Sequence, residues 1–175
     1  YFLRALEQAK KKSARRIMAI VYANIALLLL VQNKRQSCAR FLGYAEQLLV
    51  QYPHPITEHM CSMVGTLLAL VEGNINRAYE KGLRCMQVVR EKAFHFKQAE
   101  TLSLLIEATA KQKKWTDASM LLEELAHLPN KQSAIHQFSF WNAKGQMAAL
   151  RQDQDEYEEA IESIERLFKE EQSLT

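Results

Sequence analysis

Small and apolar residues recur along the chain with a period of about 40 residues. Within each repeat the recurring positions are separated by four and then three residues, a spacing that places them on one face of a helix. Helix breakers are scarce, since the 175 residues include only 5 Gly and 3 Pro. The pattern therefore predicts an all-α protein made of repeated helical units. The recurring small residues are Cys38, Ala78, Ala118 and Ala160, and seven residues after each lie Ala45, Cys85, Leu125 and Leu167.

Turn signals divide each repeat into two helices. Asn33, Gly73 and Lys113 lie 40 residues apart, each shortly before the helix that carries the small residue. A single hairpin of this kind exposes an apolar face that it cannot bury alone, so we expect neighbouring hairpins to stack. The prediction is a half-helix at 1–12 followed by hairpins at 14–52, 55–92, 94–128 and 130–171. The first helices are expected at 14–32, 57–72, 95–112 and 131–151, and the second helices at 36–51, 75–91, 115–128 and 155–171.

Two helix ends have a specific cause in the sequence. Thr57 follows Pro55 and is predicted to be the N-cap of the helix at 57–72, because its hydroxyl can accept a hydrogen bond from an amide two or three residues later. Pro129 cannot continue the helix that we expect to end at Leu128.

The residues at these positions resemble the tetratricopeptide-repeat family, whose repeat is a helix–turn–helix. The run at 113–118 is similar to the family's turn between the two helices and the alanine that follows it. The 40-residue spacing exceeds the family's usual repeat of about 34 residues. It resembles the longer units of maltose-activator-type bacterial regulators and of some eukaryotic assembly scaffolds. The signature positions hold Tyr22, Ile25, Ala26 and Leu29 in the first full repeat, Leu102, Leu105 and Ile106 in the third, and Trp141, Gly145 and Ala148 in the fourth.

This resemblance implies a right-handed α-solenoid, a single superhelical domain over 1–175 whose first helices line a concave surface. It also implies which side chains line that surface. They are mostly apolar in the first two repeats, where methionine suits an adaptable groove, and polar or acidic in the last two. Alternatively, the apolar ones fill the core against another segment, as apolar stripes at helical spacing usually do. The candidate groove residues are Asn24, Leu27, Met60, Met63, Leu67, Glu100, Glu107, Asn142 and Gln146.

Asn24 is the most distinctive of these candidates. It interrupts the longest apolar stretch, Ile17–Val31, in which the other 14 residues are apolar. An amide in such surroundings needs a hydrogen-bond partner. We expect that partner to be either the backbone of a bound peptide or an adjacent helix.

Charge is distributed unevenly along the chain, although the formal net charge is only +3. Residues 1–40 hold nine bases and one acid, whereas residues 152–175 hold nine acids and two bases. The basic start lacks the interleaved aromatic residues typical of nucleic-acid binding, so a solvated helix face is favoured and we expect no nucleic-acid binding by this domain. The oppositely charged ends predict head-to-tail self-association.

The remaining sequence features concern the compartment. Three cysteines are too few, and odd in number, for a disulfide framework, which favours a reducing compartment. The 15-residue apolar stretch is short for a membrane span, so no membrane partner is expected. We predict a cytoplasmic location, or a nuclear one in a eukaryote. Because the chain starts at Tyr1 in what resembles the second half of a helix, we expect a fragment of a longer protein.

No sequence motif for catalysis or cofactor binding is present, since the chain has no Gly-rich phosphate loop, no nucleophile elbow and no His-Glu-x-x-His helix. His54, His59 and Cys61 suggest a zinc site, but no fourth ligand is evident nearby. A turn histidine, a helix histidine and a buried thiol are the favoured interpretation. We predict no catalytic residues, no metal, no cofactor and no enzymatic activity.

The expected function is protein–protein interaction. In this hypothesis the chain is a scaffold or regulatory domain of a larger protein and binds a segment of another protein on its concave face. The alternative is a domain that senses a small effector in a multidomain transcription regulator. An enzyme would need titratable groups clustered in a cleft, which the sequence alone does not reveal.

Overall fold

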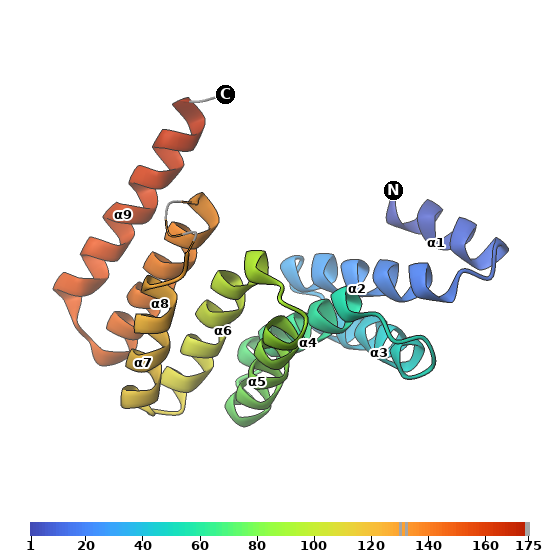
Figure 1. Ribbon diagram of the computed structural model, residues 1–175, viewed down its shortest axis with the longest axis horizontal. Coiled ribbons are helices and arrows are strands. Elements are labelled where there is room, and N and C mark those ends of the chain that lie inside the picture. The colour runs from blue at the N-terminus through green and yellow to red at the C-terminus, as the bar shows by residue number, and fades with distance from the viewer. Residues whose placement is uncertain (130, 132, 174–175) are drawn as a thin grey trace. The chain divides into compact units, whose positions relative to one another are not determined.

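The computed structural model describes residues 1–129, 131 and 133–173, and every regular element within them is a helix (Figure 1). This confirms the predicted all-α class. The chain divides into two compact units, unit 1 (Tyr1–Ala93) and unit 2 (Phe94–Thr175). Unit 1 contains α1 (Phe2–Lys11), α2 (Arg15–Val31), α3 (Arg35–Gln51), α4 (Pro55–Val71) and α5 (Ile75–Glu91). Unit 2 contains a short 3-10 helix, η1 (His95–Lys97), then α6 (Gln98–Lys111), α7 (Trp115–Ala126), α8 (Ala134–Arg151) and α9 (Gln154–Ser173).

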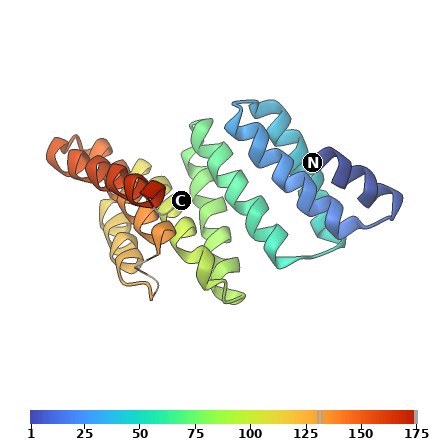
Figure 2. The same cartoon turned by 90° about the horizontal axis from the view of Figure 1, so that it is seen from above.

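The helices pack as neighbouring pairs inside each unit. In unit 1, α2 packs on α3 and α4 packs on α5, and α2 and α4 also contact each other, running side by side in Figure 2. In unit 2, α6 packs on α7 and α8, and α8 packs on α9. The predicted helical hairpins are therefore present, whereas the right-handed superhelix implied by the family resemblance stays a prediction. Among the described helices, none combines the length and the hydropathy of a membrane-spanning segment.

Residues in the left-handed backbone conformation end the first helices at the predicted turns. Asn33, Gly73 and Lys113 have φ values of 58°, 74° and 60°. After each of them, the next backbone N–H donates to a carbonyl five residues earlier, as from Lys34 to Leu29 at 2.8 Å. This geometry satisfies carbonyls at a helix end, and glycine adopts it most easily. The turn positions inferred from the 40-residue period are confirmed.

The recurring small residues belong to the buried core. Cys38, Ala78, Ala118 and Ala160 all have no exposed surface. At the crossing of α8 and α9, a Cβ added to Gly145 would lie 3.1 Å from the Cβ of Ala160. Larger side chains at such positions would push the helices apart.

The predicted N-cap of α4 is wrong. The helix starts at Pro55, which occupies its first turn, and His54 stands at the N-cap position in extended conformation. Thr57 is already inside the helix and fully buried, with its Oγ1 2.9 Å from Nδ1 of His54. Proline is favoured at the first helical position because its missing N–H is not needed there, so the helix begins two residues earlier than expected.

Helix ends in unit 2 differ from the prediction by one to three residues. The first helix at 95–112 begins as the 3-10 turn η1 before it becomes α6. Helix α7 ends at Ala126 rather than Leu128, and α8 begins after Ser133, whose Oγ accepts from the N–H of His136 at 3.2 Å. The predicted start of the last hairpin, residue 130, lies outside the described residues.

Candidate functional site

The solvent-facing side of α2 is apolar along almost its whole length. Ile17, Leu28 and Val31 are 51%, 47% and 79% exposed. Together with Ile20, Asn24 and Leu27, which are partly buried, they fall within about 100° of the helix circumference. Asn24 is the one polar residue among these six.

The solvent-facing side of α4 has the same character. Ile56 and Val71 are 49% and 46% exposed, and Met60, Met63 and Leu67 between them are partly buried. Helix α3 packs against both α2 and α4, so the exposed sides of these two helices both face away from α3. We call these residues the first-helix face of unit 1. It consists of Ile17, Ile20, Asn24, Leu27, Leu28, Val31, Ile56, Met60, Met63, Leu67 and Val71, and it holds no charged residue.

Asn24 finds its hydrogen-bond partner within its own helix. Its Nδ2 donates to the backbone carbonyl of Ile20 at 2.9 Å. The expectation that a bound peptide or an adjacent helix must supply this partner is therefore not met. A side chain that bonds the carbonyl one turn earlier is a local solution open to polar residues within a helix. The amide Oδ1 takes no part in this bond and is an acceptor.

Three predicted groove residues belong to the face and to the core at once. Leu27, Met60 and Met63 are partly exposed, yet they pack against the buried cluster that includes Ala23, Cys38 and Val64. The groove and core interpretations of these residues are thus compatible, because one edge of each side chain touches the core and the other is exposed.

The predicted acidic groove residues lie on α6 in unit 2, and each is ion-paired on or beside its own helix. Glu100 lies 2.7 Å from the ammonium of Lys97, and Glu107 lies 2.7 Å from that of Lys111. Pairs three or four residues apart are ordinary features of a helix surface. These carboxylates are therefore held by local partners.

The remaining predicted groove residues, Asn142 and Gln146, lie on α8 and are partly buried. The Nδ2 of Asn142 donates to the Oγ of Ser103 on α6 at 3.3 Å, so this amide links two first helices. All nine predicted residues thus lie partly exposed on the first helices, five of them in unit 1 and four in unit 2.

Sequence reasoning missed the most exposed apolar residues of the face. Ile17, Leu28, Val31, Ile56 and Val71 are the members with the greatest exposure. The signal was present, because these residues continue the same helical stripe by steps of three or four. These residues are not among the groove positions that the family resemblance implies.

Cys61 is a buried thiol on the core side of α4, 3% exposed. Burial raises the pKa of this thiol to about 12, and the negative charge of Glu46 adds to the effect. The thiolate, which is the nucleophilic and metal-binding form, is therefore disfavoured. Burial, followed by the charge of Glu72, also raises the pKa of Cys38.

Unit 2 holds a cavity of about 650 Å³ between the first turn of α6, the segment after α7 and the first turn of α8. Its walls are mostly apolar, and two histidines take part in them. The lining residues are His95, Phe96, Gln98, Ala99, Leu128, Pro129, Ser133, Ile135 and His136.

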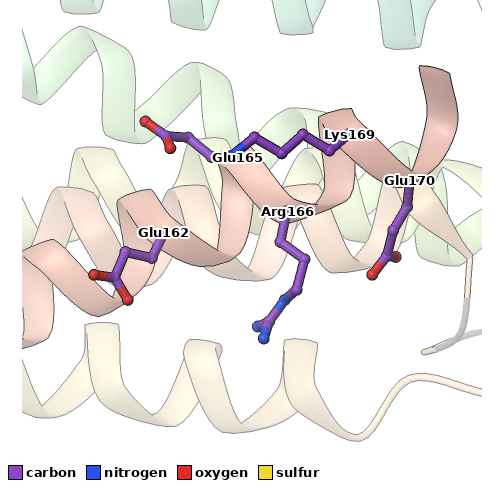
Figure 3. Close-up of a pocket in the computed structure, with 5 residues that line it drawn as sticks. All are labelled: Glu162, Glu165, Arg166, Lys169 and Glu170. Atoms are coloured by element: carbon purple, nitrogen blue, oxygen red, sulfur yellow. The ribbon is translucent and has the colours of Figure 1, made fainter. Parts of the chain in front are cut away.

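A second hollow, of about 450 Å³, lies on the surface of α9 and is lined by charged side chains of that helix alone (Figure 3). Acids and bases alternate along it at a spacing of four, a pattern that stabilises a solvated helix face. Arg166 points away from Lys169 and Glu165 in Figure 3, and its Nη2 donates to the Oγ of Ser163 at 3.3 Å. No second element closes this hollow into a cavity. Its lining is Glu162, Glu165, Arg166, Lys169 and Glu170.

Over the part of the chain that the structure describes, no group of three or more histidine, cysteine or acidic side chains is arranged to hold a metal ion. Comparison with protein-family models, with curated proteins and with solved structures finds no match. The described residues thus offer two candidate sites, the first-helix face of unit 1 and the cavity of unit 2.

Proposed function

We propose that the chain is a protein-interaction domain, and that the first-helix face of unit 1 binds a segment of another protein. The observation that carries this proposal is the apolar character of the face. Ten of its eleven residues are apolar, and five of these are 46% exposed or more. Contiguous apolar surface on a monomer is costly in water and commonly marks an interaction site.

The partner segment that fits best is an amphipathic helix. The two apolar stripes lie on helices that contact each other, and an amphipathic helix binds to such a surface through anchors at steps of three and four residues. Met60 and Met63 stand in the middle of the α4 stripe, where their flexible thioethers adapt to the shape of the anchors. Because the face holds no charged residue, the binding free energy comes mainly from apolar burial.

Asn24 gives the face one directional contact. Its Nδ2 is occupied by the carbonyl of Ile20, and its Oδ1 is the acceptor that a donor on the partner meets. A single hydrogen bond of this kind contributes about 0.5–1.5 kcal/mol, so it fixes register more than affinity. Apolar burial contributes more, at about 25 cal/mol for each Å² removed from water.

The six methionines offer a direct test of where a partner binds. Helical peptides are selected from a displayed library against the intact chain, and the chain is then labelled with ¹³C at the methionine methyl groups. We expect the methyl signals of Met60 and Met63 to shift on peptide addition. Those of Met86, buried in the same unit, and Met120, exposed on α7, should stay in place. Saturation without any change at Met60 and Met63 would place the partner elsewhere and reject the proposal.

A second candidate function, the sensing of a small effector, is favoured by the cavity of unit 2. Its volume of about 650 Å³ lies within the range of pockets that hold small ligands. The sensor hypothesis predicts that a ligand of this cavity raises the unfolding temperature of unit 2, whereas a partner peptide of the first-helix face stabilises unit 1. Membership of a larger regulator or assembly rests on the family resemblance alone.

A further inference from the structure

A cluster of basic side chains adjoins the first-helix face of unit 1 at the start of α2. Residues 1–16 hold six bases and only one acid, Glu7. The five bases around the turn between α1 and α2 are all exposed, and none forms an ion pair with the residues that the structure describes. Their positive charge is therefore available to a partner. We call these five residues the basic cluster, and they are Lys10, Lys11, Lys12, Arg15 and Arg16.

Two members of the basic cluster and one member of the first-helix face line the same hollow, which has a volume of about 490 Å³. Ile17, the first residue of the face, is 51% exposed, and Tyr52 lines the hollow from the end of α3. The apolar stripe of α2 is therefore continuous with the basic cluster. The lining residues are Ser13, Ala14, Arg15, Arg16, Ile17 and Tyr52.

Positive charge is more concentrated at the start of α2 than elsewhere around the face. Lys34 and Arg35 follow α2, and the exposed Glu72 follows α4. The acid in the first turn of α4, Glu58, is ion-paired with Arg84 of α5. The surroundings of the face are thus electrically asymmetric, although the face itself holds no charged residue.

An acidic helix fits this asymmetry better than an anionic membrane does. Both carry negative charge, but a membrane surface is charged over its whole extent and would also meet Glu72, whereas a helix can hold its acids at one end. The stripe on α2 also has the length of a helix of about four turns. Ile17 and Val31 lie 14 residues apart on it, or about 21 Å at a rise of 1.5 Å per residue.

From these features we infer that the partner of the first-helix face is an amphipathic helix with Asp or Glu residues in the turn at one end. Its apolar anchors lie along α2 and α4, and its acidic turn meets Arg15 and Arg16 at the hollow. This inference rests on the proposed function, because it names the chemistry of the partner that the face binds. Charges at the rim of an interface affect the association rate and the orientation more than the affinity. The acidic turn therefore determines which way round the helix lies.

The first test uses the intact chain and helical peptides selected against it from a displayed library. We expect the selected peptides to carry acids in the turn at one end of their apolar stripe. Two further versions of one such peptide replace these acids by Gln or by Lys and keep the anchors. At about 150 mM salt the Gln version should bind about 3- to 10-fold more weakly, through slower association, and the Lys version more weakly still.

Two charge reversals at matched positions locate the contact. Arg16 and Arg77 are both exposed, and each lies in the first turn of a helix of unit 1, where a glutamate suits the helix dipole. Arg16→Glu should weaken binding of the acidic peptide about 10-fold and improve binding of the Lys version. Arg77→Glu, on α5 and outside the face, should change neither affinity by more than about 2-fold.

A nitroxide attached to the acidic end of the peptide reports the orientation. The chain is labelled with ¹³C at the isoleucine and valine methyl groups. We expect the nitroxide to broaden the signal of Ile17 more strongly than that of Val31, because the acidic turn lies at the start of α2. Equal broadening of both signals, or stronger broadening of Val31, would contradict this orientation.

The inference can fail while the proposed function stands. If the three peptide versions bind equally and Leu28→Glu still weakens their binding, the face binds a helix without an acidic contact, which overturns the inference alone. If Leu28→Glu leaves peptide binding unchanged, the proposed function fails and the inference fails with it.

Two other occupants of the face would also overturn the inference. Binding to phosphatidylserine vesicles, without binding of the acidic peptide, would identify a membrane surface. Methyl signals of Met60 and Met63 that shift with the concentration of the chain alone, at about 150 mM salt, would identify a second copy. We expect neither result, and we expect the acidic peptide to shift both methionine signals.

Discussion

His136 on α8 donates from Nε2 to the carbonyl oxygen of Leu125 at the end of α7, with 2.6 Å between the two atoms. The contact joins two helices across the segment between them, and both residues are at least 95% buried. The same carbonyl accepts a longer bond of 3.3 Å from the N–H of Leu128. The histidine therefore supplies the shorter of the two bonds at this helix end.

Replacement of His136 should destabilise unit 2. For His136→Ala we expect a loss of about 1–3 kcal/mol, because a buried carbonyl loses its shorter bond and the ring leaves a gap. His136→Gln should recover part of this loss, since its amide can donate to the same carbonyl. Urea unfolding followed by tryptophan fluorescence reports on unit 2, which holds both Trp115 and Trp141. Equal stability of His136→Ala and the unchanged chain would show that the bond contributes nothing.

The crossing of α8 and α9 predicts a position-dependent effect of glycine replacement. Gly145→Leu should destabilise the fold by about 1–3 kcal/mol, because even a Cβ added at this position would lie 3.1 Å from the Cβ of Ala160. Gly43→Leu, inside α3, is the matched control, since no atom lies within 4 Å of a Cβ at that position. It should be neutral or stabilising by up to about 1 kcal/mol, as leucine is the better helix former. Chemical unfolding followed by circular dichroism measures both, and equal effects would contradict the close crossing.

The buried thiol of Cys61 predicts a stability that falls at high pH. Its pKa is about 12 in the folded chain and near 9.0 for an ordinary thiol, so above pH 9 the unfolded chain loses this proton first. The folded state then binds more protons, and the free energy of unfolding declines by about 1.4 kcal/mol per pH unit from this group. The contribution is complete below pH 9 and is lost as the pH rises towards 12.

Urea unfolding at pH 8, 9 and 10 measures this decline. Cys61→Ala is the control, because it removes the titrating thiol and leaves the lysine and tyrosine side chains in place. Its stability should be lower at pH 8 but fall less steeply above pH 9 than that of the unchanged chain. Parallel pH profiles of the two proteins would show that Cys61 does not titrate with the raised pKa.

The charge distribution predicts weak association between copies of the chain. Lys10, Lys11 and Lys12 are exposed near one end of the sequence, and Glu158 and Glu159 are exposed near the other. We expect sedimentation velocity to show concentration-dependent association at about 20 mM salt and its loss at about 500 mM, because salt screens exposed charges. A sedimentation profile that changes with neither the salt nor the protein concentration would contradict the prediction.

The helices were predictable because the turn residues and small residues that define them act locally and recur along the sequence. Asn33, Gly73 and Lys113 each adopt the left-handed turn conformation at the expected position, and the recurring small residues are fully buried. The start of α4 was missed for an equally local reason. Pro55 suits the first turn of a helix, and this preference outweighed the capping tendency of Thr57.

The candidate sites were less predictable, because they depend on which side chains meet in space. The Asn24 side chain donates to the backbone carbonyl of Ile20 on its own helix. No sequence pattern distinguishes this hydrogen bond from one to a bound partner. The cavity of unit 2 brings together residues as far apart in the sequence as His95 and His136, and no sequence pattern indicates that they meet. The division into two units after Ala93 falls at a predicted hairpin boundary, but nothing in the sequence distinguishes this boundary from the others, since the 40-residue period continues through it.

The most direct test of the proposed function is the affinity of a selected helical peptide for three charged variants. Leu28→Glu and Val71→Glu place a charge on the first-helix face, at positions that are 47% and 46% exposed. Leu83→Glu adds the same charge on α5, outside the face, at a position that is 44% exposed. The account predicts that each face variant weakens peptide binding at least about 10-fold while Leu83→Glu leaves it unchanged. Equal affinity of all three variants and the unchanged chain would contradict it.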